Sequence, residues 1–311
     1  MNKTAFLFPG QGSQSIGMLS ELARQSDMVK NTFDEASQVL RYNLWKLVQE
    51  GPEERLNQTE VTQPAMLAGG VACWRVWKQA GGFDPDFMAG HSLGEYSALV
   101  AAGTLEFGSA VELVVHRAQC MNVATPAGTG AMAAIIGLED HALRQVCEAA
   151  AKGQVVSCAN FNSPGQVVIA GDKDAVARAC ELARAAGARR AVTLAVSVPS
   201  HCSLMRKAAR DFSLALADVV FHQGGIPVLH NVDARSRSTE ENLRMALEQQ
   251  LWQPVRWTDT IEELSRRDVR RFAECGPGKV LAGLNRRILR DAEIVGLFDL
   301  DVMKATIREW S

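Results

Sequence analysis

Ser92 is the first residue of this sequence whose surroundings favour chemistry, because it stands between two glycines in Gly90-His91-Ser92-Leu93-Gly94. Residues 87–88 before it are apolar and predict a short buried strand, and residues 98–102 after it predict a helix. Flanking glycines let a strand and a helix approach closely and hold the central residue in the strained turn called a nucleophile elbow. The alternative is an ordinary strand-to-helix connection, since glycine and serine are common in loops.

A serine nucleophile needs a base, and histidine is the side chain best suited to that task at neutral pH. We expect the base to be His201, because its segment returns the chain from a predicted insertion to the larger domain, where a cleft would form. The alternative is a structural role, which is common for an isolated loop histidine. The other five are predicted to point elsewhere on the turn (His91) or to lie on the surface (His116, His141, His222 and His230).

No acidic residue stands out as the group that would orient His201. Asp172 and Asp174 lie between Ser92 and His201 in the chain, as the acid does in α/β-hydrolases, but both fall within the predicted insertion. A backbone carbonyl or a side-chain amide could accept the second ring N–H instead.

Arg117 is unusual because it lies on the apolar side of its predicted helix, residues 110–123. At about 100° per residue it is roughly 140° from Glu112, which belongs to the polar stripe. A guanidinium in apolar surroundings keeps its charge and needs an anionic partner. That partner is either a protein carboxylate in a structural ion pair or a carboxylate of the substrate, and a side chain that reaches solvent is a third interpretation.

Gln11 follows the first predicted strand, residues 5–8, in Pro9-Gly10-Gln11-Gly12. A loop in this place can bring a backbone N–H to the reacting carbonyl, where the N–H of Leu93 would complete an oxyanion hole. The alternatives are a simple glycine-rich turn or a phosphate loop, and the Lys-Ser/Thr ending of a Walker motif is missing.

The elements around these residues predict an α/β fold with a largely parallel sheet. Short apolar strands precede glycine-containing turns at residues 5–8, 87–88 and 272–273, and residues 30–50 and 64–80 have the apolar spacing of amphipathic helices. In such folds the ligand site lies at the carboxyl ends of the strands.

The middle of the chain predicts a smaller, inserted domain. Strands at 131–136, 155–159, 166–170 and 190–196, with a turn at 162–165 and helices at 139–151 and 173–186, give the β-α-β-β-α-β order of ferredoxin-like domains. We therefore expect a ferredoxin-like domain at residues 127–198, inserted into a discontinuous catalytic domain at residues 1–126 and 199–311.

Composition narrows the classes of function. The chain has 311 residues, 47% apolar and 22% charged, with a net charge of −2 and no basic stripe, which argues against nucleic acid as the main partner. It has no apolar run long enough to span a membrane, and residues 5–8 are too few for a secretory signal. Seven scattered cysteines predict reduced thiols rather than a disulfide framework or a metal site. We expect a cytoplasmic monomer that holds neither metal nor cofactor.

Taken together, these motifs resemble the family of bacterial malonyl-CoA:acyl carrier protein transacylases. The resemblance covers residues 1 to about 290 and includes Ser92, Arg117 and four further motifs in the same order. These are Phe8-Pro9-Gly10-Gln11-Gly12-Ser13-Gln14, Asn160-Phe161-Asn162-Ser163-Pro164-Gly165-Gln166, Pro199-Ser200-His201 and Gly276-Pro277-Gly278.

The resemblance implies an α/β, hydrolase-like catalytic domain and a ping-pong transfer of malonyl from malonyl-CoA to acyl carrier protein in type II fatty acid synthesis. It assigns the nucleophile to Ser92, the acid–base to His201, and the orientation of His201 to the main-chain carbonyl of Gln250. It further assigns the malonyl carboxylate to Arg117 and the oxyanion to Gln11 and Leu93. Asn162 is assigned to substrate binding. Coenzyme A enters as a substrate thioester rather than as a cofactor.

Some features depart from the family pattern or leave other functions open. The tail after residue 290 corresponds to no motif that we can place, since the family's tails vary, and Ser200 is small where malonyl-selective polyketide acyltransferases carry phenylalanine. A serine hydrolase would keep Ser92 and His201 without needing Arg117, and a non-catalytic carrier-binding subunit would need none of the three. Lys279, Arg286 and Arg287 could form a basic patch for an acidic carrier helix, or simply a solvated helix face.

Overall fold

The computed structural model of the chain describes residues 2–126, 128–196 and 198–311. Ala127, with which the expected insertion begins, lies outside the described residues. Within them, a five-stranded parallel sheet has the strand order β7-β2-β1-β8-β9. Its strands are β1 (Lys3–Phe8), β2 (Phe87–Gly90), β7 (Val228–Leu229), β8 (Val269–Glu274) and β9 (Glu293–Gly296). The fold is therefore α/β with a mainly parallel sheet.

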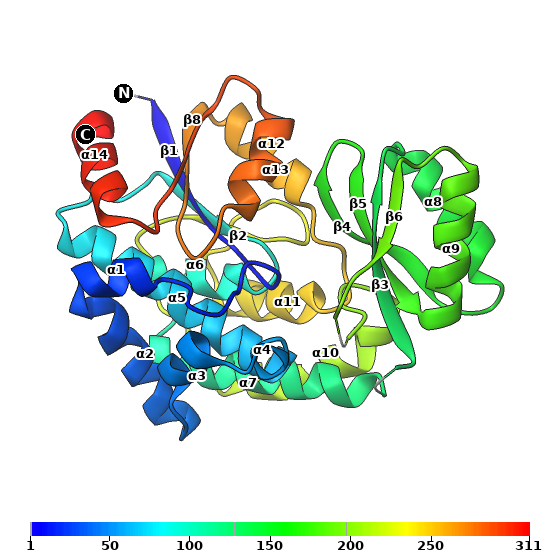
Figure 1. The fold of residues 1–311 in the computed structure, drawn as a ribbon, viewed down its shortest axis with the longest axis horizontal. Coiled ribbons are helices and arrows are strands. Elements are labelled where there is room, and N and C mark those ends of the chain that lie inside the picture. The colour runs from blue at the N-terminus through cyan, green and yellow to red at the C-terminus, as the bar shows by residue number, and fades with distance from the viewer. Residues whose placement is uncertain (1, 127, 197) are drawn as a thin grey trace.

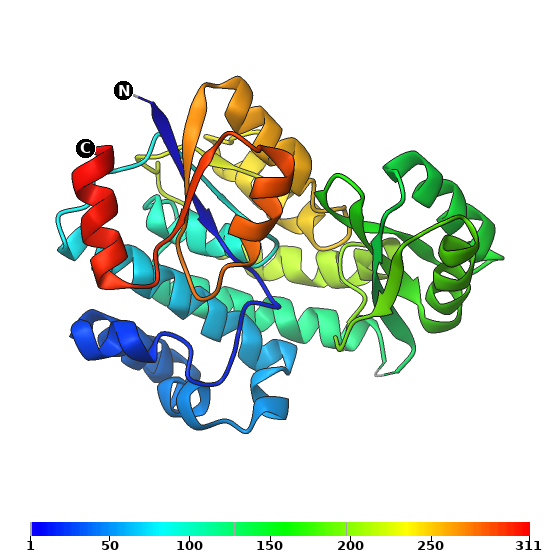
Figure 2. The same ribbon diagram turned by 45° about the horizontal axis from the view of Figure 1, so that its top comes forward.

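Helices cover both faces of this sheet, so its strands are apolar on both sides (Figures 1 and 2). Successive side chains of β1 alternate between two cores: Phe6 and Phe8 pack with α2, α5, α7 and α10, while Ala5 and Leu7 pack with α12 and α13. The helices of this larger part are α1 (Ser20–Gln25), α2 (Asp27–Leu40), α3 (Leu44–Glu50), α4 (Glu53–Leu56), α5 (Thr59–Gln79), α6 (Gly94–Ala101), α7 (Phe107–Ala124), α10 (Arg206–Ala217), α11 (Glu240–Gln250), α12 (Trp257–Arg266), α13 (Val280–Ile288) and α14 (Leu300–Trp310), with the 3₁₀ turn η1 (Ser203–Met205).

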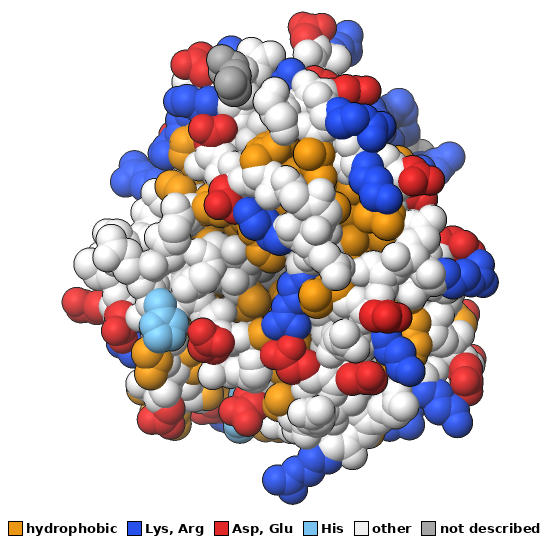
Figure 3. Space-filling view, turned by 90° about the vertical axis from the view of Figure 1, so that its left-hand side faces the viewer, with side chains coloured by type: hydrophobic (Ala, Val, Ile, Leu, Met, Phe, Trp, Pro, Cys, Tyr) orange, Lys and Arg blue, Asp and Glu red, His pale blue; other side chains and the backbone are white. Residues whose placement is uncertain are grey.

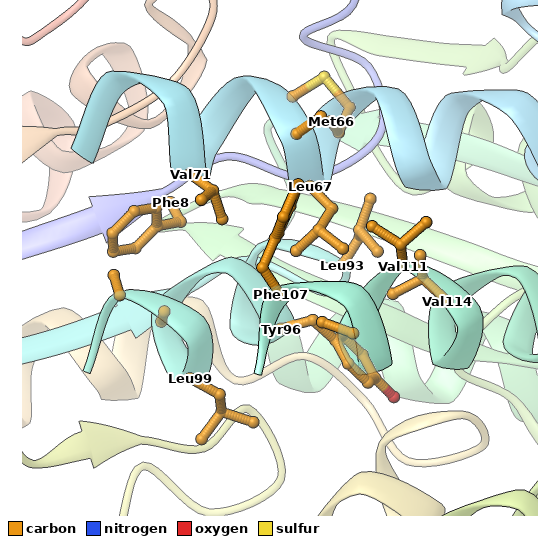
Figure 4. Packing of buried hydrophobic residues seen from close by; sticks show 14 of the residues in the cluster. Phe8, Met66, Leu67, Val71, Leu93, Tyr96, Leu99, Phe107, Val111 and Val114 are labelled. Atoms are coloured by element: carbon orange, nitrogen blue, oxygen red, sulfur yellow. The ribbon is translucent and has the colours of Figure 1, made fainter. Parts of the chain in front are cut away.

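The larger core fixes the helix that follows the candidate nucleophile. Leu93 and Tyr96 are fully buried in it and lie with Phe8 of β1, Leu67 of α5 and Val111 of α7 (Figure 4). Each such side chain contributes about 1.5–3 kcal/mol of burial free energy. The start of α6 is thus held against several elements at once.

Residues 30–50, which have the apolar spacing of amphipathic helices, form two helices, α2 and α3. Arg41 has a φ of 59°, a left-handed conformation that ends α2. The Asn43 side chain then accepts a hydrogen bond from the Lys46 N–H at 2.7 Å and caps α3. The apolar spacing continues across this break, so periodicity alone did not reveal it.

Between α7 and η1 the chain forms a four-stranded antiparallel sheet with the order β4-β5-β3-β6. The predicted β-α-β-β-α-β order is observed. The expected turn at 162–165 is narrower than predicted: Ser163 pairs with Gln166, and the turn needs only Pro164 and Gly165 because Gly165 adopts a φ of 68°. The elements are β3 (Gly130–Ile136), α8 (Asp140–Ala151), β4 (Val156–Ser163), β5 (Gln166–Asp172), α9 (Lys173–Ala185) and β6 (Arg190–Thr193).

One face of this antiparallel sheet is covered by α8 and α9, and the other face is not covered by helices of the insertion. Ala133 and Ile135 pack with α8 and α9, whereas Met132 belongs to a separate cluster with Cys202, beyond the end of the insertion. Figure 1 shows α8 and α9 on the outer side of the sheet, away from the larger part. The uncovered face therefore borders the larger part.

All seven cysteines are free, and six are buried. In the described part of the chain, no helix is both long enough and apolar enough to cross a membrane.

Candidate active site

The chain makes a strained turn at Ser92, as the glycine spacing predicted. Strand β2 ends at Gly90, α6 begins at Gly94, and Ser92 between them has a φ of 50°. A Cβ on Gly94 would lie 2.0 Å from the carbonyl oxygen of Phe8, and one on Gly90 would lie 1.9 Å from the carbonyl carbon of Gly94. Only glycine fits at both places, and the hydroxyl of Ser92 is presented at the carboxyl end of the parallel sheet.

His201 lies directly against this hydroxyl. Its Nε2 is 2.7 Å from Ser92 Oγ, and its Nδ1 is 2.7 Å from the main-chain oxygen of Gln250. Because a carbonyl only accepts, Nδ1 carries the hydrogen and Nε2 is left as the acceptor that a base needs. The carbonyl belongs to the last turn of α11, the negative end of a helix dipole, which would stabilise an imidazolium.

Burial controls the protonation of His201. Loss of solvent, followed by the nearby charge of Arg117, lowers the pKa of the imidazole from 6.5 to about 3. The ring is consequently neutral at physiological pH and can take the proton of Ser92. A neutral base beside a serine hydroxyl is the arrangement required for nucleophilic catalysis.

Arg117 is fully buried in α7, as its place on an apolar helix face predicted. Its guanidinium donates to Gln63 Oε1 at 2.8 Å, to Gln250 Oε1 at 3.1 Å and to Ser92 Oγ at 3.4 Å. Burial lowers the pKa of the guanidinium, but an arginine stays protonated at neutral pH. Among the described residues no carboxylate lies within ion-pair distance, so this buried positive charge has only two amide oxygens and the Ser92 hydroxyl as hydrogen-bond partners.

The loop after β1 lies against the Ser92 turn. A Cβ on Gly10 would lie 2.2 Å from the His91 carbonyl oxygen and 3.5 Å from the Leu93 nitrogen, so the two backbones are in contact. The side chain of Gln11 is turned to Thr59, with Nε2 3.1 Å from Oγ1. Neither the Gln11 nor the Leu93 backbone N–H donates to another group in the described residues. Both are free to bind an oxyanion.

Asn162 is placed beside His91 rather than along the cavity. Its Oδ1 is 2.8 Å from His91 Nε2, and burial lowers the pKa of His91. The residue of this motif that lines the cavity is Asn160.

The sequence did not reveal a buried polar network behind the nucleophile. Asn231, directly beyond β7, accepts a hydrogen bond from the Ser92 N–H at 2.7 Å and donates from Nδ2 to the Gly90 carbonyl at 2.6 Å. Glu95 accepts from the Asn231 N–H at 2.9 Å and lies 2.7 Å from His230 Nδ1. The prediction that His230 lies on the surface is wrong, because its side chain has no exposed area. It faces a carboxylate far away in sequence, which no local pattern indicates.

A cavity of about 280 Å³ opens above Ser92 and His201. Both parts of the chain line it: Gln11, Gly12, Gln14, Asn57, Thr59, His91, Ser92, Ser200 and His201 come from the larger part, and Met132, Asn160, Leu194, Ala195, Val196 and Val198 from the inserted segment. Among the described residues, no three metal-binding side chains lie close enough together to hold a metal ion. The cleft presents a hydroxyl and an imidazole, and the buried guanidinium of Arg117 lies 3.4 Å from the hydroxyl oxygen without lining the cavity.

Comparison with known proteins agrees with this chemistry. Residues 5–307 match the family described as "Acyl transferase domain". The expectation that the similarity ends near residue 290 is therefore wrong, because the match continues through most of the tail. The chain is 52% identical over 307 residues, 99% of either chain, to the malonyl CoA-acyl carrier protein transacylase of Escherichia coli K12, and 44% identical to that of Bacillus subtilis over 99% of this chain and 97% of the relative.

Two solved structures extend the comparison. The transacylase of Coxiella burnetii superimposes with a TM-score of 0.98 at 48% identity, covering 99% of this chain and 97% of that one. A malonyl-transacylase in complex with a type II PKS acyl-carrier protein superimposes with a TM-score of 0.97 at 50% identity, covering 99% of both chains.

Proposed function

This chain belongs to the acyl transferase family, among the malonyl CoA-acyl carrier protein transacylases, and on that premise we propose that it transfers malonyl through an ester on Ser92. The donor is malonyl-CoA and the acceptor is the phosphopantetheine thiol of an acyl carrier protein. The observation that carries this mechanism is the 2.7 Å contact between Ser92 Oγ and His201 Nε2, with the Arg117 guanidinium 3.4 Å from the same oxygen.

In the first half-reaction Ser92 Oγ attacks the thioester carbonyl while its proton passes to His201 Nε2. The oxyanion accepts hydrogen bonds from the backbone N–H groups of Gln11 and Leu93. The C–S bond then breaks, the sulfur of coenzyme A takes the proton from His201, and malonyl remains as an oxygen ester. The Gln250 carbonyl orients the imidazole throughout, so no aspartate is needed.

The second half-reaction repeats these steps in reverse with another thiol. His201 takes the proton from the thiol of the carrier arm, the sulfur attacks the serine ester, and Ser92 recovers its proton as malonyl leaves. Because both carriers are thioesters on the same arm, the overall free-energy change is small. The site therefore has mainly to keep water from the ester.

Arg117 supplies the selectivity for malonyl. The malonyl carboxylate, close to the ester carbonyl, would replace an amide oxygen as the partner of the buried guanidinium. Arginine and a carboxylate can form two parallel hydrogen bonds, and such bidentate ion pairs are strong. An uncharged acyl group would leave the cation without an anion, which is costly in a buried site.

Several broader assignments belong to the same proposal. The larger part, residues 1–126 and 199–311, is a hydrolase-like catalytic domain, and residues 127–198 form a ferredoxin-like domain inserted into it. Asn162 contributes to substrate binding through His91. Coenzyme A is a substrate and no resident cofactor is required. The protein works as a monomer in the cytoplasm, away from membranes and nucleic acid.

Isotope exchange tests the function. Malonyl-CoA and labelled free coenzyme A are mixed with the protein in the absence of any carrier, and the label is followed into malonyl-CoA. The ping-pong route predicts rapid exchange that disappears in Ser92→Ala. Exchange that requires the carrier would contradict the covalent route, and release of free malonate without exchange would indicate a hydrolase.

A further inference from the structure

Thr59, the first residue of α5, lies between the loop that carries Gln11 and the buried Arg117. It is 4% exposed and lines the catalytic cavity. Its hydroxyl oxygen is 3.1 Å from Gln11 Nε2, 3.3 Å from Gln11 Oε1 and 3.0 Å from Gln63 Nε2. Gln63 Oε1 in turn accepts a hydrogen bond from Arg117 Nη1 at 2.8 Å. These four side chains form one hydrogen-bonded group, which we call the Thr59 network.

The packing of α5 against α7 brings the Thr59 network together. Thr59, Gln63 and Leu67 are spaced four residues apart on α5, so they share one face of that helix. Arg117 follows Val114 by three residues on α7 and shares a face with it. Leu67 and Val114 belong to the apolar core between these two helices (Figure 4). The network therefore continues this apolar contact at its end next to the cavity.

The positive charge of Arg117 sets the direction of the hydrogen bonds in the network. A guanidinium only donates, so the amide oxygen of Gln63 must face Arg117 and its NH₂ group must face Thr59. A threonine hydroxyl can accept two hydrogen bonds and donate one. After the bond from Gln63, the Thr59 hydroxyl can still accept one and donate one, and both atoms of the Gln11 amide lie within reach.

Exposed charges do not compete with Arg117 in this network. The face in Figure 3 has basic and acidic side chains interspersed over it, and salt screens such exposed charges. Arg117 and Gln63 have no exposed area, and a hydrogen bond is electrostatically stronger in the protein interior than in water. The buried end of the network is thus firmly held, and its other end is the exposed Gln11.

The loop that carries Gln11 has few other side-chain hydrogen bonds to hold it. The Gly12 N–H donates to Gln14 Oε1 at 2.7 Å, and Gln14 Nε2 donates to Asn57 Oδ1 at 2.9 Å, but both bonds are exposed. Among the described residues, the Gln11 side chain has Thr59 as its hydrogen-bond partner. A displacement of this loop would move the Gln11 backbone N–H, and an oxyanion donor must lie within about 2.7–3.1 Å of the oxyanion.

We propose that Thr59 is a positioning residue whose hydroxyl anchors the Gln11 loop to Arg117, so that one buried cation serves both the malonyl carboxylate and the oxyanion hole. This inference rests on the proposed function, because it concerns the acylation step of that reaction. Thr59 acts through the Gln11 side chain and not on the reacting atoms. The longer amide contact of Arg117, to Gln250 Oε1 at 3.1 Å, is the one that the carboxylate displaces, so the network persists when malonyl binds.

Thr59→Val and Thr59→Ser separate the hydroxyl from the shape of the side chain. Loss of an oxyanion donor costs about 10²–10³ in rate, and a displaced donor costs less, so we expect single-turnover acylation of Thr59→Val by saturating malonyl-CoA to slow about tenfold. The half-saturating concentration should stay within twofold of the wild type. Thr59→Ser, which keeps the hydroxyl, should acylate within twofold of the wild-type rate.

Thr62→Val is the matched control on the same helix. Thr62 is fully buried, does not line the cavity, and donates from its hydroxyl to the main-chain carbonyl of Leu56. This variant should lose stability but keep the wild-type acylation rate. If it slows acylation as much as Thr59→Val, the loss belongs to α5 as a whole and the proposal is overturned.

Gln11→Leu tests whether Thr59 acts through Gln11. This variant keeps the backbone N–H of residue 11 and removes the amide that the Thr59 hydroxyl binds. It should slow acylation about as much as Thr59→Val, and Gln11→Leu/Thr59→Val should be no slower than either single variant, because residues of one network are not additive. Effects that multiply would overturn the proposal. Gln11 is exposed, so this variant tests the role even where Thr59→Val does not fold.

Acetyl-CoA separates the oxyanion loop from the carboxylate site. Thr59→Val should slow acylation by acetyl-CoA and by malonyl-CoA by the same factor, because both acyl groups form the oxyanion. In Arg117→Ala the Gln63 amide is no longer oriented, so adding Thr59→Val should lower the acetyl rate less than threefold. A loss confined to malonyl-CoA, or an undiminished loss in Arg117→Ala, would overturn the proposal.

These outcomes are distinct from a failure of the proposed function. A wild-type protein that forms no malonyl ester contradicts the function itself. A Thr59→Val protein that acylates at the wild-type rate leaves the function intact and contradicts only the positioning role of Thr59.

Discussion

Replacement of Asn231 by alanine should slow the attack of Ser92 without touching any catalytic group. The Asn231 side chain makes two hydrogen bonds, a partly buried one with the Ser92 N–H and a buried one with the Gly90 carbonyl, and they hold a serine with a φ of 50°. A non-glycine residue in this left-handed region costs about 1–2 kcal/mol. Without Asn231 the turn has fewer contacts to hold that conformation.

The expected magnitude follows from these contacts. Asn231→Ala leaves the partly buried Ser92 N–H and the buried Gly90 carbonyl without partners, which costs about 1–3 kcal/mol each, so we expect a loss of about 2–6 kcal/mol in the free energy of unfolding. A displacement of Oγ by about 1 Å can reduce the rate of a positioned reaction about 10²-fold. We therefore expect acylation by malonyl-CoA to slow by 10- to 100-fold, with little change in substrate affinity.

Rapid-quench mass spectrometry of the acyl-enzyme measures this rate, and denaturant titration measures stability. Asn285→Ala is the matched control, because Asn285 is equally buried and accepts a hydrogen bond from Trp257 Nε1 at 2.9 Å without facing the cleft. It should lose stability but keep its acylation rate. If Asn231→Ala acylates as fast as this control, Asn231 is not a positioning residue and the reasoning is refuted.

Three further changes follow from the site. Arg117→Ala should lower kcat/KM for malonyl-CoA about 10²-fold or more, through loss of a buried charged partner worth about 3 kcal/mol, and should raise relative use of acetyl-CoA in the same assay. Because the pKa of His201 is lowered to about 3, single-turnover acylation should stay flat as pH falls through 6.5; a midpoint near 6.5 would contradict the buried base. The unfolded state alone gains that proton, so the contribution of His201 to the free energy of unfolding should fall by about 2 kcal/mol from pH 7 to pH 5. The difference in stability between the wild type and His201→Gln measures it, because Glu274, whose pKa burial raises to about 7, acts in the opposite direction in both proteins. Gly94→Ala, whose Cβ would meet the Phe8 oxygen at 2.0 Å, should unfold at lower denaturant, whereas Gly108→Ala in open space on α7 should not.

Local patterns predicted the parts of the site that depend on neighbours in sequence. The turn at Ser92 was predicted from the two glycines, Gly90 and Gly94, that flank it. Arg117 was singled out because its charge interrupts an apolar helix face. His201 was predicted from its place at the end of the insertion. The order of elements in the insertion followed from its alternating strands and helices.

The remainder depends on contacts between distant segments. Strand β7 has two residues, too few for a pattern, yet it places Asn231 against the nucleophile turn. His230 lies in a polar stretch of sequence but is buried against Glu95, 135 residues away. The break between α2 and α3 occurs where Arg41 adopts a left-handed φ. The sequence does not predict this conformation, because it is usual for glycine and not for arginine. Arg189 and Arg190 of the insertion likewise line one hollow with Arg286, Arg287 and Arg290, which only the fold brings near them.

The central claim is that malonyl is carried on Ser92, and intact-protein mass spectrometry after mixing with malonyl-CoA tests it most directly. The account predicts one malonyl adduct on the wild type, located at Ser92 by peptide mapping, absent from Ser92→Ala and lost when holo-carrier protein is added. An adduct on another residue, or malonyl transfer by Ser92→Ala at the wild-type rate, would contradict it.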